Sequence, residues 1–145
     1  MSRPKVMVAL RDSSTVESLV TLACQLSKGM GAELTAMHVV AVPLPTPLDA
    51  PEEVIDHAGK ELLAQAKRVA ESFSQHLSTE LLRAREVGEA IVGAAQEHRV
   101  DLLVMGHHKP HGHTLSETLW GGIARYVAHH APCRVIVQIP APEPK

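Results

Sequence analysis

Short apolar runs alternate with longer amphipathic segments along this chain. Apolar residues dominate residues 5–10 (KVMVAL), 33–40 (ELTAMHVV), 101–106 (DLLVMG) and 134–139 (RVIVQI). Runs of this kind are typical of strands that are covered on both faces, as in a parallel sheet. A more polar run, TELLRAREV at residues 79–87, predicts a strand at the edge of that sheet.

The segments between the apolar runs carry helical signals. Apolar residues recur at helical spacing over residues 16–26, 54–73, 89–98 and 119–130. This periodicity predicts four helices. Ser14 and Glu17 have the spacing of a capping box, so we expect Ser14 to cap the first helix. Thr114 and Glu117 repeat that spacing ahead of the last helix.

A proline-rich segment, residues 41–53 (AVPLPTPLDAPEE), separates the second strand from the second helix. Its four prolines oppose regular structure, so we expect a long, mobile loop that borders the ligand side of the sheet. In the helix that follows, Val54, Leu62 and Phe73 are expected on one buried apolar stripe. In the third helix, His98 is expected to face inward with its apolar neighbours.

Five strands and four helices that alternate along the chain predict an α/β fold. The connections are too long for hairpins, so a single-domain, doubly wound five-stranded parallel sheet with right-handed crossovers is expected. We assign residues 1–140 to this domain and residues 141–145 to a disordered tail. In such open sheets ligands bind beyond the carboxyl ends of the strands, where the strand order reverses. Residues 10–13 and 105–113 are therefore expected to face each other across one crevice.

Composition narrows the classes of function. The formal net charge is −2 and aromatic residues make up 2% of the chain, which argues against nucleic-acid binding through a basic surface or a stacking platform. No apolar run approaches the ~20 residues of a membrane span, and no signal-peptide cleavage pattern is present, so we expect a cytoplasmic protein without membrane insertion. Cys24 and Cys133 form no ligand cluster, which favours buried, reduced thiols.

Four histidines stand within seven positions of the run GHHKPHGHTLSETLWGG, residues 106–122. Imidazoles at this spacing can ligate Zn, Ni or Cu, but no carboxylate or thiolate stands among them, and we predict no metal site. Lys109 with His107 or His108 could instead bind phosphate through charge-assisted hydrogen bonds. A solvated polar loop is the third interpretation.

Four stretches of the chain resemble the universal stress protein family. They are VMVAL with DSS (residues 6–10 and 12–14), LTAMHVV (34–40), VGEAIVGAAQEHRVDLLVMGHH (87–108) and GGIARYVAHHAPCRVIVQ (121–138). The pairing of DLLVMG with HAPCRVIV about 25 residues later is a specific signal of this family. The resemblance covers nearly the whole chain.

The resemblance implies a strand order of 3-2-1-4-5 and a homodimer joined through the last strand, here Arg134 to Ile139. The ATP-binding branch of the family has a G-x2-G-x9-G-[ST] pattern after the fourth strand. Backbone amides hold the phosphates there, and the base lies near the ends of the first two strands. A second branch lacks the pattern and is thought not to bind ATP.

This chain departs from the ATP-binding pattern at three places. Gly106 matches the first glycine, but Lys109 stands where the second is expected. The spacing to Gly121 is two residues too long, and Gly122 replaces the terminal Ser or Thr. Arg11 stands where many relatives carry an Asp at the end of the first strand.

The predicted nucleotide site combines the ends of the first, second and fourth strands with the glycines that follow them. Its residues are Leu10, Arg11, Asp12, Val39, Val40, Met105, Gly106, His107, His108, Lys109, Gly112, Gly121, Gly122 and Ile123. The expected ligand is ATP or another adenine nucleotide, with Mg if it is a triphosphate. No catalytic residue is predicted.

Three functions stay open at this point. The first is a non-catalytic stress-response module that binds an adenine nucleotide weakly, and whose protein or transporter partner is unknown. The second is a nucleotide-free dimeric interaction protein, which the altered glycine spacing favours. The third is a slow ATPase in which Asp12 helps to hold Mg, although no GK[ST] phosphate loop occurs in the chain.

Overall fold

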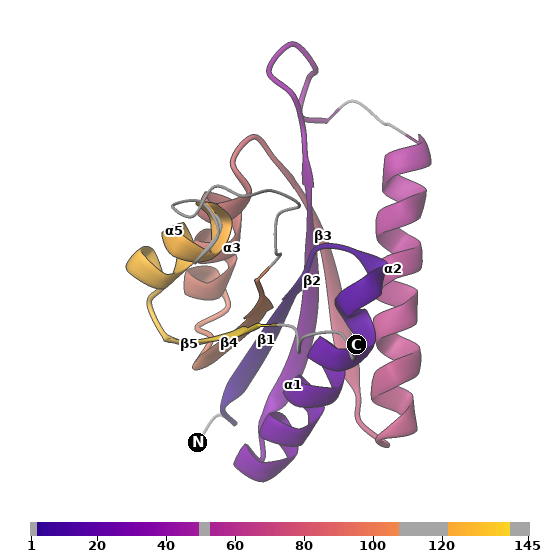
Figure 1. Ribbon diagram of the computed structural model, residues 1–145, viewed down its shortest axis with the longest axis vertical. Coiled ribbons are helices and arrows are strands. Elements are labelled where there is room, and N and C mark those ends of the chain that lie inside the picture. The colour runs from indigo at the N-terminus through magenta and orange to yellow at the C-terminus, as the bar shows by residue number, and fades with distance from the viewer. Residues whose placement is uncertain (1–2, 50–52, 108–121, 140–145) are drawn as a thin grey trace, which may run out of the picture.

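Five parallel strands form the centre of the structure, a computed structural model that describes residues 3–49, 53–107 and 122–139 (Figure 1). The strands are β1 (Lys5–Leu10), β2 (Glu33–Ala41), β3 (Leu77–Ala84), β4 (Leu102–Gly106) and β5 (Arg134–Gln138). Their order in the sheet is β3-β2-β1-β4-β5, and every pairing is parallel. The expected fold class and strand order are confirmed.

Helices cover both faces of the sheet. They are the short 3-10 turn η1 (Ser13–Thr15), α1 (Val16–Met30), α2 (Glu53–Ser72), α3 (Val87–Glu97) and α5 (Gly122–His130). Helices α1 and α2 lie on one face, and α3 and α5 lie on the other (Figure 1). The chain therefore folds as three layers, with the sheet in the middle.

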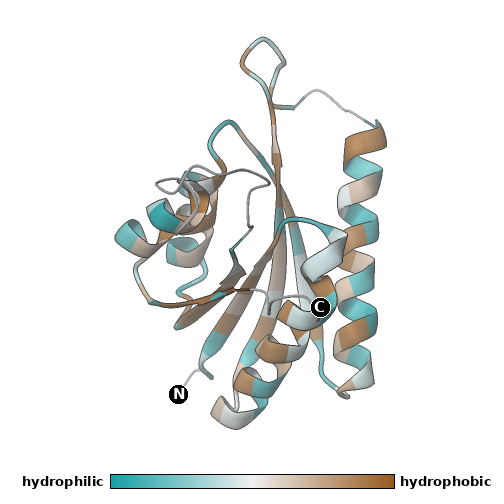
Figure 2. Cartoon of the chain, in the orientation of Figure 1, coloured by the Kyte–Doolittle hydropathy of each residue, from teal (hydrophilic) through white to brown (hydrophobic). Residues whose placement is uncertain are grey.

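Alternate residues of β1 contribute to two separate hydrophobic cores, one on each face of the sheet. Val6 and Val8 pack under α1 and α2, whereas Met7 packs under α3 and α5. Figure 2 shows the same division, with hydrophobic colour along the strands and on the helix surfaces turned toward them. A strand that is apolar on both faces is what a parallel sheet between two helical layers requires.

The start of α1 differs from the expected capping box. The helix begins at Val16, after η1, and its N-cap residue Thr15 makes no side-chain capping bond. Asp12 caps η1 instead, because its carboxylate accepts a hydrogen bond from the Ser14 amide at 3.1 Å and another from the Ser14 hydroxyl. Ser14 is therefore not the capping residue. Its amide and hydroxyl are donors to the cap, Asp12.

Three side chains that were expected to face inward do not. Val54 is 83% exposed and Phe73 is 38% exposed, because only the middle of α2, from Gly59 to Ala70, packs against the sheet. The His98 imidazole is half-buried and pairs with Glu80 of β3, with 2.7 Å between Nε2 and Oε2. His98 thus lies at the rim of the sheet and pairs with a polar side chain, and it does not face the core as expected. Thr114, Glu117 and residues 140–145 lie outside the described residues.

Helices α3 and α5 approach each other closely at one glycine. A Cβ built on Gly88 of α3 would lie 2.8 Å from Cδ1 of Tyr126 in α5, whereas a Cβ on Gly93 of the same helix would meet nothing within 4 Å. The Tyr126 ring in turn stacks on His130, with 4.1 Å between the ring centroids. The contact between the two helices therefore depends on the missing side chain at Gly88.

Substitution of these two glycines should move stability in opposite directions. Gly88→Ala should lower the free energy of unfolding by about 1–3 kcal/mol, because the methyl group overpacks the Tyr126 contact. Gly93→Ala, the matched control, should raise it by up to about 1 kcal/mol through helix propensity alone. Urea unfolding of both variants checks this, and a Gly88→Ala variant as stable as Gly93→Ala would contradict the packing described.

Candidate functional site

The ends of three neighbouring strands meet at one edge of the sheet. Strand β1 pairs with β4 up to Ala9 and Met105, and with β2 up to Leu10 and His38. The strand order reverses between β1 and β4, which is where ligands bind in open parallel sheets. The structure therefore brings together the described parts of the predicted site that lie on β1, β2 and β4.

Most of the strand residues in the predicted site are buried. Leu10, Val39, Val40 and Met105 belong to the hydrophobic core, so their side chains serve packing and only their backbone groups are suited to a ligand. Strand β2 offers such groups because it continues to Ala41, beyond the point where β1 ends. The backbone groups of Val39, which face the β1 side, thus lie beyond the end of that strand.

Gly106 is the last residue of β4, and His107 follows it. A Cβ on Gly106 would come within 3.2 Å of Cδ1 of Leu19, so a larger residue here would press on α1. His107 is 4% exposed, and its backbone amide donates a 2.9 Å hydrogen bond to the carbonyl oxygen of Gln138 in β5. The His107 amide therefore extends the sheet and is not directed at a ligand.

The glycines and histidines after β4 are only partly described. His108, Lys109, Gly112 and Gly121 lie outside the described residues. Within the described ranges, no group of three His, Cys, Asp or Glu residues is arranged to hold a metal ion. The sequence prediction of a phosphate-binding histidine run stays a prediction.

Helix α5 begins directly at the predicted site. Gly122 is its first residue, is exposed, and has open space where a Cβ would lie. Ile123 packs against the core under α3 and α5. The first turn carries no acidic residue, so the positive end of the helix dipole is not neutralised from within the helix.

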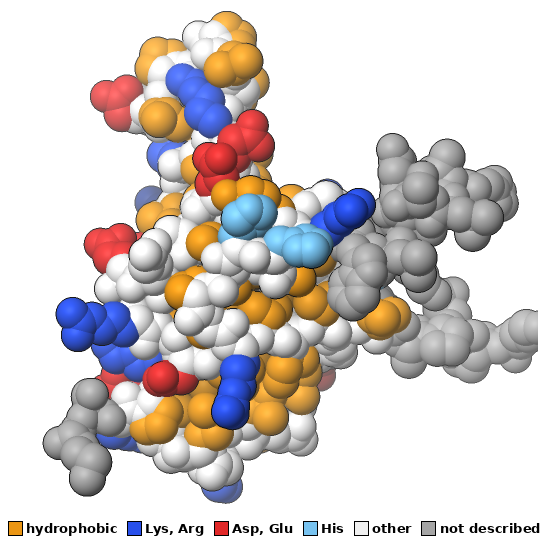
Figure 3. Space-filling model, turned by 90° about the vertical axis from the view of Figure 1, so that its left-hand side faces the viewer, with side chains coloured by type: hydrophobic (Ala, Val, Ile, Leu, Met, Phe, Trp, Pro, Cys, Tyr) orange, Lys and Arg blue, Asp and Glu red, His pale blue; other side chains and the backbone are white. Residues whose placement is uncertain are grey.

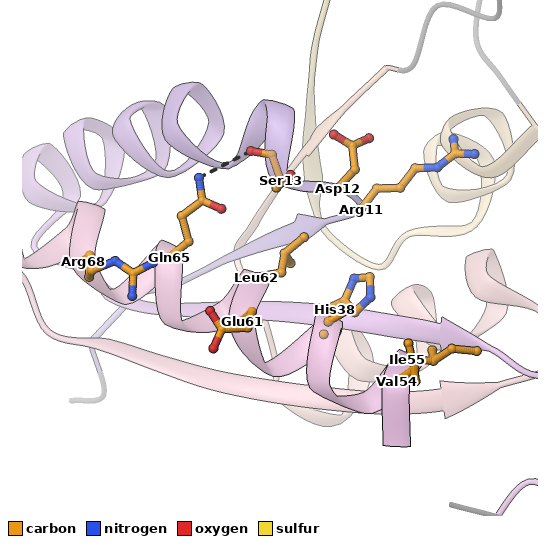
Figure 4. Close-up of a pocket in the computed structure, with 12 residues that line it drawn as sticks. Arg11, Asp12, Ser13, His38, Val54, Ile55, Glu61, Leu62, Gln65 and Arg68 are labelled. Carbon is orange, nitrogen blue, oxygen red and sulfur yellow. Dashed lines mark hydrogen bonds between the residues drawn. The ribbon is translucent and has the colours of Figure 1, made fainter. Parts of the chain in front are cut away.

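A pocket of about 530 Å³ lies beside this edge, between η1 and α2 (Figure 4). It shares Arg11 and Asp12 with the predicted site. Ser13, which was expected at the crevice, also lines it. Its remaining lining residues were not predicted and are His38, Val54, Ile55, Ala58, Gly59, Glu61, Leu62, Gln65 and Arg68. Gln65 closes one side with a 3.4 Å hydrogen bond from Nε2 to the Ser13 carbonyl oxygen. The volume is in the range of small-molecule pockets.

His38 forms the wall between this pocket and the end of β1. Its Nδ1–H donates a 2.8 Å hydrogen bond to the carbonyl oxygen of Leu10, the last residue of β1. The ring also lies against α2, because a Cβ on Gly59 would come within 3.2 Å of its Cδ2 atom. The end of the central strand is thereby fixed by a side chain from the neighbouring strand.

Arg11 and Asp12 follow β1 and differ in their contacts. Asp12 is half-buried and is engaged with Ser14, whereas Arg11 is exposed. In Figure 4 the Arg11 guanidinium points away from α2, and the Asp12 carboxylate points in another direction. The two opposite charges are therefore not directed at each other.

The two cysteines have no features of reactive thiols. Burial raises the pKa of the Cys24 thiol, and it also raises the pKa of Cys133, with a further contribution from the negative charge of Asp101. A raised pKa keeps a thiol protonated at neutral pH and makes it a poor nucleophile. Cys24 is buried and Cys133 half-buried, and both are free.

Two arginines of β3 and the connection after it hold the proline-rich loop. The Arg85 guanidinium donates to the carbonyl oxygens of Pro43 at 2.5 Å and Thr46 at 2.7 Å. Arg83 donates through Nε to Leu48 O at 2.8 Å and through Nη1 to both carboxylate oxygens of Asp56 in α2. Over residues 42–49 the loop has turns and no regular structure, as expected, and these bonds tie it to β3 and the connection after it. Its mobility stays a prediction.

The family comparison agrees with this geometry. The model of the universal stress protein family matches residues 2–138. The chain belongs to the universal stress protein family. A universal stress protein of Methanocaldococcus jannaschii is 29% identical over 139 residues, which cover 92% of this chain and 80% of that protein.

Solved universal stress proteins share the fold. One from Archaeoglobus fulgidus superposes with a TM-score of 0.77 at 21% identity and covers 94% of both chains. The protein from that organism in complex with dAMP superposes with a TM-score of 0.72 at 20% identity, covering 94% of this chain and 97% of that one. Other neighbours are a universal stress protein in complex with cAMP (TM-score 0.70) and one from Arabidopsis thaliana with AMP bound (TM-score 0.65).

The described helices of this universal stress protein do not include one that could cross a bilayer. The 20-residue helix α2 is long enough, but its polar face excludes it, and no other helix in residues 3–49, 53–107 or 122–139 is both long and apolar enough.

The anchoring of the proline-rich loop can be tested through Arg85. Arg85→Met removes the donor that holds Pro43 and Thr46, so hydrogen exchange of the Thr46 amide, which bonds to the Pro43 carbonyl at 3.0 Å, should accelerate. We expect roughly a tenfold increase, which corresponds to about 1.4 kcal/mol of local opening. Arg68→Met on α2 is the control and should leave this exchange unchanged. Equal protection of Thr46 in both variants would show that the turn holds without the arginine.

Proposed function

We propose that this universal stress protein is a non-catalytic regulatory module of the cytoplasm that binds an adenine nucleotide weakly at the ends of β1, β2 and β4. The observation that carries the proposal is the meeting of these strand ends at the switch point of the sheet. Three structural neighbours are complexes with dAMP, cAMP and AMP. Their ligands support an adenine nucleotide as the chemical class for this chain.

The described residues fit such a ligand. The backbone of Val39, on the β1 side of β2 and beyond the last residue of β1, offers a peptide donor and acceptor to the edge of a base. Gly122 offers the start of a helix with open space above it, where an anion is stabilised by the helix dipole. These groups supply binding and orientation, and no charge other than the dipole.

The requirement for Mg is weaker in this proposal than for an ATPase. Asp12, the carboxylate that could help to hold the ion, already accepts hydrogen bonds from the amide and hydroxyl of Ser14. A mononucleotide needs no bridging cation between phosphates. We therefore favour a ligand that binds without Mg, and a function that depends on occupancy and not on hydrolysis.

The second part of the proposal is a homodimer that pairs β5 with its copy. Strand β5 lies at the edge of the sheet, its residues Val135 to Val137 are half-buried, and Ile139 just beyond it is 59% exposed. Hydrophobic side chains are also visible on this side of the molecule (Figure 3). An apolar edge strand invites pairing, and a two-fold axis closes it. A nucleotide-free dimer that acts through protein contacts is the second candidate function, and this edge is the observation that favours it.

A charge placed at Gly122 tests the nucleotide proposal. Gly122→Asp should weaken AMP binding at least roughly tenfold by repelling the phosphate, while the acidic residue in the first helical turn leaves folding intact or improves it by about 0.3–1 kcal/mol. Gly122→Ala is the control, because it fills the same open space without charge. Calorimetric titration with AMP, cAMP and ATP, after extraction of any nucleotide retained on purification, gives the measurement. An absence of retained nucleotide and of binding heat would favour the nucleotide-free function.

The homodimer has its own test. Val135→Lys should yield monomer, because a charge on the shared edge opposes pairing of two identical strands. Ile139→Lys changes an exposed side chain and should act in the same direction without loss of fold. Thr79→Lys places the same charge on an exposed residue of β3 at the opposite edge and should leave the dimer intact. Light scattering after gel filtration reports the mass, and unchanged dimer in both β5 variants would refute the interface.

A further inference from the structure

Arg11 is the first residue beyond the central strand of the sheet. Its neighbour Leu10 ends β1, and β1 lies between β2 and β4. The Arg11 side chain is exposed, and in Figure 4 it extends away from α2 and from the other side chains of the pocket. A cation therefore stands at the switch point of the sheet.

No described residue bonds to the guanidinium of Arg11. Across residues 3–49, 53–107 and 122–139 the structure shows no hydrogen bond or ion pair from its guanidinium, whereas the guanidiniums of Arg83 and Arg85 bond to loop carbonyls or a carboxylate. The adjacent Asp12 forms no ion pair with it, and its carboxylate accepts hydrogen bonds from Ser14. Arg11 thus contributes a charge that no described contact of the fold uses.

The remaining described groups of the proposed site lack a positive charge that faces solvent. Val39 and Gly122 offer only backbone groups, and His107 is buried. Such groups can bind a base or a neutral sugar as well as a phosphate. A guanidinium is different, because its fork of N–H donors matches two phosphate oxygens and binds them in a charge-assisted, bidentate manner.

We propose that Arg11 is the specificity-determining residue that recognises the phosphate of the ligand, so that the protein binds a nucleoside phosphate and discriminates against the free nucleoside. This inference rests on the proposed nucleotide function. The preference for a phosphorylated ligand then comes mainly from the Arg11 side chain at the end of β1. The backbone groups at the start of α5 add to phosphate binding. The chemical class it selects is a phosphomonoester or phosphodiester on an adenine nucleoside.

Calorimetric titration of the full-length protein with adenosine, AMP and ATP tests the inference. The wild type should bind AMP at least roughly tenfold more tightly than adenosine, the effect of one charged hydrogen-bonding partner. Arg11→Gln should lose most of this preference, since only the helix dipole at Gly122 then favours the phosphate, and should leave adenosine affinity unchanged. Arg11→Lys keeps the charge without the fork and should lie between them. The preference for AMP should also decrease with added KCl in the wild type and not in Arg11→Gln.

Arg68→Gln is the matched control, because Arg68 is another exposed arginine that lines the same pocket from α2. It should bind all three ligands as the wild type does. Equal AMP affinity in the wild type and Arg11→Gln, or equal losses in Arg11→Gln and Arg68→Gln, would overturn the role of Arg11 and leave nucleotide binding intact. An absence of heat with all three ligands in the wild type would instead overturn the proposed function, and the role of Arg11 with it. Arg11 is exposed, so the melting temperatures of its variants should match the wild type.

Discussion

The burial of β1 on all sides is the constraint on which the rest of the structure depends. Met7 and Val8 are fully buried on opposite faces, and both edges of the strand are paired. A strand in this position has no unpaired edge and no face exposed to solvent. It can therefore continue only while its residues are apolar. That condition ends at Leu10, where the sequence changes to Arg11 and Asp12. The ligand side of the sheet begins there because polar groups cannot continue inside the core.

The end of β1 is held firmly although the chain turns polar at that point. The carbonyl oxygen of Leu10 accepts a hydrogen bond from His38, and Asp12 organises the turn that follows through Ser14. The His38 ring in turn requires the close approach of α2 at Gly59. A site whose framework is fixed by such contacts loses little conformational freedom when a ligand binds, which favours recognition by even a few groups.

Local periodicity was sufficient to predict the strands and helices, since apolar runs and amphipathic stripes are properties of neighbouring residues. The same information could not show that α2 packs only through its middle, which left Val54 exposed, because that depends on where the sheet ends. Nor could it show the pocket between η1 and α2. Ser13, His38 and Gln65 are far apart in the chain and meet only through the crossover that places α2 on this face. The glycine in the middle of α2 was the single local sign of a close approach there.

The arginines near the ligand side show how one residue type serves both structure and recognition. The side chains of Arg83 and Arg85 donate hydrogen bonds to carbonyl groups of the loop at residues 42–49. These bonds replace backbone hydrogen bonds that the loop's prolines, which have no N–H, cannot make. A guanidinium used in this way has part of its five N–H donors engaged and is held against the loop. The backbone on either side of Arg11 is hydrogen-bonded by the sheet and by the turn at η1. The N–H donors of the Arg11 guanidinium are therefore not needed to hold the chain in place. The anchoring of the loop by two arginines and the hydrogen bonding of Leu10 by His38 therefore leave Arg11 available for an anion at the point where the strand order reverses.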